Sequence, residues 1–183
     1  MDFSAVIHTV LMMTAGLTDN VGPAFQAGAE ARLDNTAYGF SFGLEVRGVL
    51  PGKVVATEPF NTDLGEAPGP QAFDIGQVGV QAVPCLRFAK YFAGCGVVQA
   101  FWVLTSDEVF AQIPGGAAGP RVSVEIPFAW RLAFFGLAEA LFPIVAAKRP
   151  FFAGSQGPLG PYVQWTQSPA SGFFAAGLSL KID

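Results

Sequence analysis

Charged residues are scarce in this chain of 183 residues: they make up 13% of it, against 51% apolar residues. A soluble domain usually carries about 25% charged residues. The positive mean hydropathy of +0.43 agrees with this deficit. We therefore expect much of the surface to meet something other than water, on a single domain that spans residues 1–183.

Histidine, cysteine and positive charge are also limited. The net charge of −4 argues against nucleic-acid binding, because that function needs a basic face. One histidine, His8, and two cysteines, Cys85 and Cys95, cannot form a zinc site without carboxylates. The sequence therefore predicts no nucleic-acid partner, no metal site and no cofactor.

No apolar run is long enough for a transmembrane helix, which needs about 20 residues. The best candidate, Leu132–Ala147, is too short and contains Glu139 and Pro143. The segment Phe3–Leu17 is also short and contains His8. The 22 glycines and 18 phenylalanines fit a β-protein better than a helical one.

What the chain has instead is an alternation of apolar and polar residues with a period of two, which indicates β-strands. Between Tyr38 and Leu50, the even positions are mostly aromatic or aliphatic, and the odd positions are glycine, serine, glutamate or arginine. The same pattern recurs in six further segments, 25–33, 77–87, 98–104, 121–128, 131–142 and 174–182. With a first strand near Ala5–Ala15, these make eight strands.

The alternation separates two sets of side chains. One set is mainly charged or amide-bearing, and we expect it to form an interior polar network of Glu30, Arg32, Glu45, Arg47, Gln81, Arg87, Gln99, Arg121, Glu125, Arg131, Glu139 and Lys181. The other set is apolar, and we expect it to face lipid through Tyr38, Phe40, Phe42, Trp102, Phe128, Trp130, Phe134 and Phe142.

Alternation alone does not say which face is wet, but three features favour a membrane barrel with a polar interior. First, short gaps between strands alternate with long ones. The short gaps are 34–37, 88–90 and one near 129; the long gaps are 51–73, 105–118 and 144–170, and 16–22 is intermediate. Second, aromatic residues stand near both ends of the strands, as interfacial girdles do. Third, the polar set includes glycines, which suit the crowded interior of eight strands.

The two cysteines lie on neighbouring strands around a short turn near Lys90. Opposed residues in such a hairpin have Cβ atoms close enough for a disulfide, and an exported protein would permit the bond. We therefore expect a disulfide between Cys85 and Cys95, the alternative being two small buried thiols.

Three short motifs add to this pattern. They are Pro84-Cys85 followed by Gly94-Cys95-Gly96, the strand Arg121–Glu125, and Ser168–Gly172 leading into the last strand. With them the chain resembles the small outer-membrane β-barrel proteins of Gram-negative bacteria that have the OmpA/OmpX-type architecture, over nearly its whole length.

The resemblance implies an all-β, eight-stranded antiparallel up-and-down transmembrane barrel, located in the outer membrane, with short periplasmic turns and long outer loops. The implied partners are membrane lipid, lipopolysaccharide and the outer-membrane assembly machinery, and the implied state is a monomer. No catalytic residues are carried over.

Both ends of the chain depart from that family's pattern. The last strand has Gly177, Leu180 and Ile182 at the spacing of an assembly signal, but Asp183 stands where an aromatic residue is usual. The start, Met1-Asp2-Phe3, has no basic signal region. Either the chain begins after its signal, or the gene start is misplaced, or the protein is not exported.

The sequence thus predicts a non-enzymatic integral outer-membrane barrel without an open pore, in a structural or surface-interaction role carried by its long loops. One alternative is a soluble lipocalin-like barrel, with an apolar ligand enclosed by Phe40, Phe42, Val80 and Trp102. Another is a barrel enzyme acting on membrane lipid, with His8, Ser4, Ser41 and Glu45 as its candidate residues.

Overall fold

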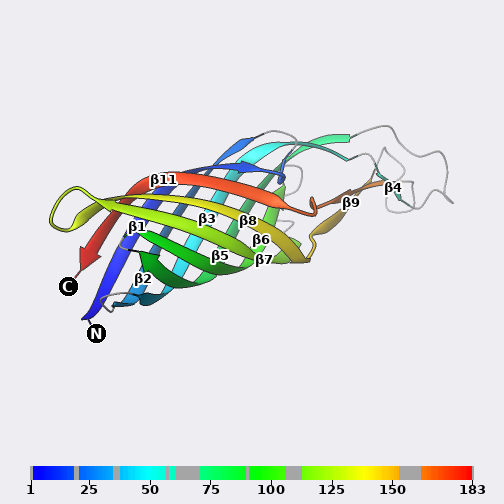
Figure 1. The fold of residues 1–183 in the computed structure, drawn as a ribbon. Helices are drawn as coiled ribbons and strands as arrows, with labels where there is room; N and C mark the ends of the chain where they lie inside the picture. Colours follow the sequence, from blue (N-terminus) through cyan, green and yellow to red (C-terminus); the bar gives the residue numbers. More distant parts are fainter. Residues whose placement is uncertain are drawn as a thin grey trace.

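Eight antiparallel strands close into one barrel (Figure 1). The computed structural model describes residues 2–18, 21–34, 38–56, 58–60, 71–89, 91–105, 113–152 and 162–182. The barrel strands are β1 (Asp2–Ala15), β2 (Gly22–Asp34), β3 (Gly39–Ala56), β5 (Gln71–Ala89), β6 (Phe92–Thr105), β7 (Ile113–Pro127), β8 (Leu132–Val145) and β11 (Ser171–Ile182). Each strand pairs with its neighbours in this order, and β11 pairs with β1 to close the ring. The expected all-β, up-and-down barrel is confirmed.

Short and long connections lie at opposite ends of the barrel. The segments 35–38, 90–91 and 128–131 join strands at the end where both chain termini lie (Figure 1). The segments 16–21, 57–70, 106–112 and 146–170 join strands at the other end. The asymmetry read from the sequence is therefore present in the fold.

A second, smaller sheet extends from the end with the long connections (Figure 1). It contains β4 (Glu58–Phe60), β10 (Tyr162–Thr166) and β9 (Lys148–Phe152), in the order β4-β10-β9. The sequence predicts loops for these segments, because three to five residues are too few to show a period of two.

Several barrel strands are also longer than their alternation indicated. β3 continues to Ala56 and β5 begins at Gln71, so the expected gap of 51–73 is shorter in the structure. β7 begins at Ile113, inside the expected gap of 105–118, and its segment up to Pro120 pairs with β6. Glycine and proline hide this part of β7, since backbone pairing does not require alternating side chains.

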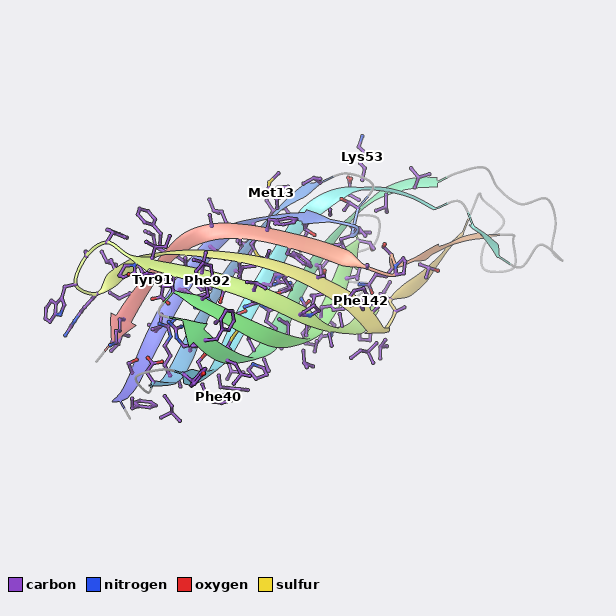
Figure 2. The ribbon with its side chains drawn as sticks, viewed as in Figure 1. Met13, Phe40, Lys53, Tyr91, Phe92 and Phe142 are labelled. Carbon is purple, nitrogen blue, oxygen red and sulfur yellow. A yellow bond between two sulfur atoms is a disulfide. The ribbon has the colours of Figure 1, made fainter. Side chains whose placement is uncertain are left out.

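Burial follows the alternation and inverts the arrangement of a soluble protein. On β3, Glu45 and Arg47 are buried, whereas Leu44 and Val46 between them are exposed. Met13, Phe40 and Phe142 likewise project from the outer wall (Figure 2). None of the described residues forms a helix long and apolar enough to cross a membrane.

Candidate functional site

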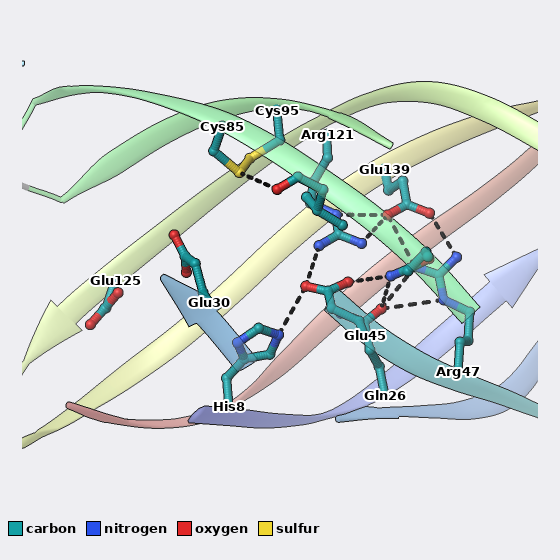
Figure 3. Close-up of polar contacts among 12 residues, drawn as sticks. His8, Gln26, Glu30, Glu45, Arg47, Cys85, Cys95, Arg121, Glu125 and Glu139 are labelled. Carbon is teal, nitrogen blue, oxygen red and sulfur yellow. Dashed lines mark hydrogen bonds and ion pairs between the residues drawn. A yellow bond between two sulfur atoms is a disulfide. The ribbon is translucent and has the colours of Figure 1, made fainter. Parts of the chain in front are cut away.

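The middle of the barrel holds a network of buried polar side chains, here called the central cluster (Figure 3). Its members are His8, Gln26, Glu45, Arg47, Gln81, Arg121 and Glu139. They come from β1, β2, β3, β5, β7 and β8, so the network ties most of the wall together across the interior.

Glu139 joins the two arginines of the central cluster. Arg47 forms a two-pronged contact with it, since Nη1 donates to Oε1 at 2.7 Å and Nη2 donates to Oε2 at 3.0 Å. Arg121 Nε donates to Oε2 of the same carboxylate at 2.7 Å. Paired contacts between guanidinium and carboxylate are among the strongest hydrogen bonds in proteins.

Glu45 is the second carboxylate of the cluster. Its Oε1 accepts from Arg121 Nη1 at 2.8 Å and lies 2.9 Å from His8 Nε2. Its Oε2 accepts from the side-chain amide of Gln81. Because two carboxylates face two guanidiniums, the formal charges of these four groups balance, which is what burial of ionised groups requires.

A second group lies toward the short turns, here called the end cluster: Glu30, Arg32, Arg87 and Glu125. Arg32 Nη2 donates to Glu30 at 2.9 Å and to Glu125 at 2.5 Å. Arg87 Nη1 lies 4.0 Å from Glu30 and 3.9 Å from Glu125. Arg87 and Glu125 are only partly buried, since they stand where the interior approaches solvent.

The interior toward the long connections is mainly apolar. Met12, Val49, Ile75, Phe101, Val103, Leu141 and Phe173 are buried there in one packed cluster. This apolar plug is set next to the central cluster: the Arg47 guanidinium lies 4.1 Å from the centroid of the Phe173 ring.

Most of the residues expected in the interior are buried there. Eight are buried: Glu30, Arg32, Glu45, Arg47, Gln81, Gln99, Arg121 and Glu139. The expectation is wrong for Arg131 and Lys181, which are exposed. Arg131 belongs to the turn beyond β7, where its guanidinium lies over the Trp130 ring at 4.5 Å, and Lys181 stands near the end of β11. The alternation predicts which side of the wall a residue faces, but it does not predict where along the axis the barrel ends.

Gln26, like His8, is a member of the central cluster that the expected interior network does not include. It accepts from Arg47 Nη2 at 2.8 Å and from Gln81 Nε2 at 3.0 Å. Its place on the same face of β2 as Glu30 and Arg32 could have identified it.

The enzyme alternative has its candidate residues inside the barrel. Ser4, His8, Ser41 and Glu45 are all buried, away from the surface that a lipid could reach. The His8 Nδ1 atom has no hydrogen-bond partner among the described residues. Nor does the described part of the chain contain a group of three or more His, Cys, Asp or Glu side chains that could hold a metal.

Cys85 and Cys95 are joined by a disulfide, as expected. They are directly opposite each other in the β5–β6 ladder. Both are buried, with neighbours Ser41 on β3 and Arg121 on β7 in register beside them.

The aromatic residues expected to face lipid are all exposed: five stand on barrel strands, and Tyr38, Phe128 and Trp130 stand beside the short turns. Tyr38, Phe40, Phe42, Trp102, Phe128, Trp130, Phe134 and Phe142 are between 39% and 87% exposed. The soluble-carrier alternative needs Phe40, Phe42, Val80 and Trp102 around an internal ligand, and the structure places all four outside.

Gly28 makes room for the central cluster, and a side chain there should disturb it. A Cβ atom on Gly28 would lie 2.5 Å from Glu45 Cγ and 2.8 Å from the Leu44 carbonyl oxygen. We expect Gly28→Ala to destabilise the barrel by about 1–3 kcal/mol, a common cost of overpacking, measured as a lower urea midpoint of unfolding. Gly96→Ala is the matched control, because nothing lies within 4 Å of a Cβ there. Equal midpoints for the two variants would contradict the tight packing of Glu45.

Comparison with known proteins gives a likeness to solved structures. No protein-family model matches the chain, and no curated protein matches it. Among solved structures, the chain is similar to the crystal structure of Ail, the attachment invasion locus protein of Yersinia pestis, in complex with the heparin analogue sucrose octasulfate. The TM-score is 0.47 at 12% sequence identity, over 98% of this chain and 97% of that chain.

Proposed function

We propose that the protein is a sealed, non-enzymatic β-barrel of a bacterial outer membrane, with a surface-interaction role at its outer end. The observation that carries the proposal is the inverted burial: ionised groups are enclosed, and the phenylalanine-rich face is exposed. Water would penalise such a surface, whereas acyl chains favour it.

Closure of the barrel supports the same placement. A membrane core offers no water to satisfy backbone groups, so a spanning sheet needs a ring without edges. Here β11 pairs with β1 over most of its length, and strands of this length suffice for a tilted crossing of a core about 30 Å thick. Tyr38, Phe128 and Trp130 near the short turns would lie at the periplasmic interface.

The filled interior supports a sealed barrel rather than a pore. The apolar plug blocks the end with the long connections, and the central cluster fills the middle. A cavity of about 10 Å³ beside His8 and Arg121 has room for roughly one water molecule. Conduction of ions or solutes would need a wider path.

The small outer sheet of β4, β9 and β10 is our candidate for the surface role. It extends beyond the barrel at the end that faces outward in this orientation (Figure 1). The sequence of β9 contains Lys148 and Arg149, and that of β10 contains Tyr162 and Trp165. Basic and aromatic residues suit contact with the phosphates and sugars of lipopolysaccharide. We further propose that the barrel is a monomer inserted by the outer-membrane assembly machinery.

Folding into lipid vesicles tests this proposal. We expect the refolded protein to migrate differently on a gel before and after boiling, to leave the vesicles only with detergent, and to retain a trapped small dye inside them. The boiled sample, which has lost the barrel, is the control. A folded form that is monodisperse in buffer without detergent would overturn the membrane placement, and dye efflux would overturn the seal.

A further inference from the structure

The disulfide between Cys85 and Cys95 is enclosed in the finished barrel. Cys85 is 6% exposed and Cys95 is 9% exposed. The pair lies beside the cavity of about 10 Å³ that His8, Glu45 and Arg121 also line, and that cavity has room for roughly one water molecule. Figure 3 shows the pair above the central cluster, on the inner side of the wall.

Both routes along the barrel axis to the disulfide are occupied. From the long-connection end, the path is filled by the apolar plug and then by the Arg47–Glu139–Arg121 contacts. From the short-turn end, the end cluster stands across the interior, with Arg32 bonded to both Glu30 and Glu125. A thiol-bearing protein could not reach either sulfur without opening the wall.

We infer that this disulfide forms before the barrel closes, by exchange with a protein that carries an oxidising disulfide. Exchange requires a thiolate to attack a disulfide sulfur directly. One cysteine thiolate attacks the carrier's disulfide, forming a mixed disulfide and releasing one carrier thiolate. The other cysteine then attacks the mixed bond at the first cysteine's sulfur and releases the second carrier thiolate. The chain loses two electrons and two protons, and the carrier's disulfide is reduced to two thiols.

The local geometry allows this early timing. The two cysteines are 10 residues apart in sequence and opposite each other in a single hairpin, so only β5 and β6 need to meet. A loop of this length closes in about 10–100 ns, far faster than a barrel assembles. The inference rests on the proposed outer-membrane location for its compartment, because an exported chain passes through an oxidising periplasm.

Reduction of the finished protein tests the order of events. The purified oxidised protein is folded in detergent micelles or unfolded in urea, and both samples receive the same concentration of dithiothreitol. Free thiols are then counted by maleimide labelling and mass. We expect the unfolded chain to lose its disulfide at once and the folded barrel to lose it on the order of 100-fold more slowly, since exchange must wait for local opening. Equal rates would overturn the inference.

A variant with its cysteine pair on the outer wall provides the control. Cys85→Ser and Cys95→Ser are combined with Leu86→Cys and Gly94→Cys, the adjacent opposed pair on the same two strands. Leu86 is exposed and lies three residues before the short-turn end of β5, where the wall approaches the solvent, so we expect this disulfide to be reduced in the folded barrel nearly as fast as in urea. If the outer disulfide is also protected, the micelle rather than burial in the barrel protects the Cys85–Cys95 disulfide. That result would overturn the inference. Should the protein fold without detergent, the membrane placement fails, and the same comparison on that soluble form still tests whether the closed barrel bars thiol exchange at the disulfide.

Discussion

Replacing Arg47 with methionine is expected to destabilise the barrel by about 3–5 kcal/mol, the usual cost of leaving a buried charge without its partner. Arg47 is fully buried and holds Glu139 through two hydrogen bonds. Without it, the central cluster keeps two carboxylates against the single guanidinium of Arg121. The measurement is the urea midpoint of unfolding in lipid vesicles. The fraction of folded protein at each urea concentration is read from the gel shift between folded and unfolded protein.

Two further variants separate charge balance from general damage. Lys53→Met also replaces a positive charge with methionine on the same strand, at a side chain that projects outward, and should alter stability by no more than about 0.5 kcal/mol (Figure 2). Arg47→Met combined with Glu139→Gln restores neutrality, because Arg121 still faces Glu45. We expect this double variant to be more stable than Arg47→Met alone. If its loss equals the sum of the two single losses, the charge-balance explanation is wrong.

The face of most residues on the clearly alternating strands could be read from the sequence, because the outer side of the wall is apolar along these strands. Along β3, Leu44 and Val46 point outward while Glu45 and Arg47 point inward, and a single register shift by one residue would reverse them all. The disulfide could be predicted for a related reason: a short turn fixes which residues of a hairpin oppose each other.

The partners across the interior could not be predicted in this way. Arg47 and Glu139 are 92 residues apart, and they meet because of the tilt and stagger of the strands on opposite sides of the barrel. His8 meets Glu45 for the same reason. Alternation contains no information on stagger, so it identifies the set of inward residues without their pairing.

The position of each residue along the barrel axis also could not be predicted from the sequence. β1 shows little alternation because its inward residues change from His8 to Val10 and Met12, where the polar interior gives way to the apolar plug. Lys181 has the inward parity but stands where β11 ends and the interior is open. In both cases the environment changes along the axis while the parity stays the same.

Leu44→Lys distinguishes an acyl-chain environment from water on the outer wall. Leu44 is 63% exposed and lies near the middle of the outward row that runs from Phe40 to Leu50. A lysine at the midplane of a bilayer costs a membrane barrel about 2–4 kcal/mol. On a wall in water the same change would be neutral within about 0.5 kcal/mol. The urea midpoint in vesicles measures the difference.

Tyr38→Lys makes the test specific for depth rather than for exposure. Tyr38 is 72% exposed, slightly more than Leu44, but it stands beside β3 at the short-turn end. Near an interface, a lysine costs only about 0–1 kcal/mol, because its ammonium group can reach the headgroups. A solvated wall predicts two small effects, and a wall within a bilayer predicts a large effect at Leu44 and a small one at Tyr38. Two small effects would therefore exclude the bilayer, however apolar the wall is.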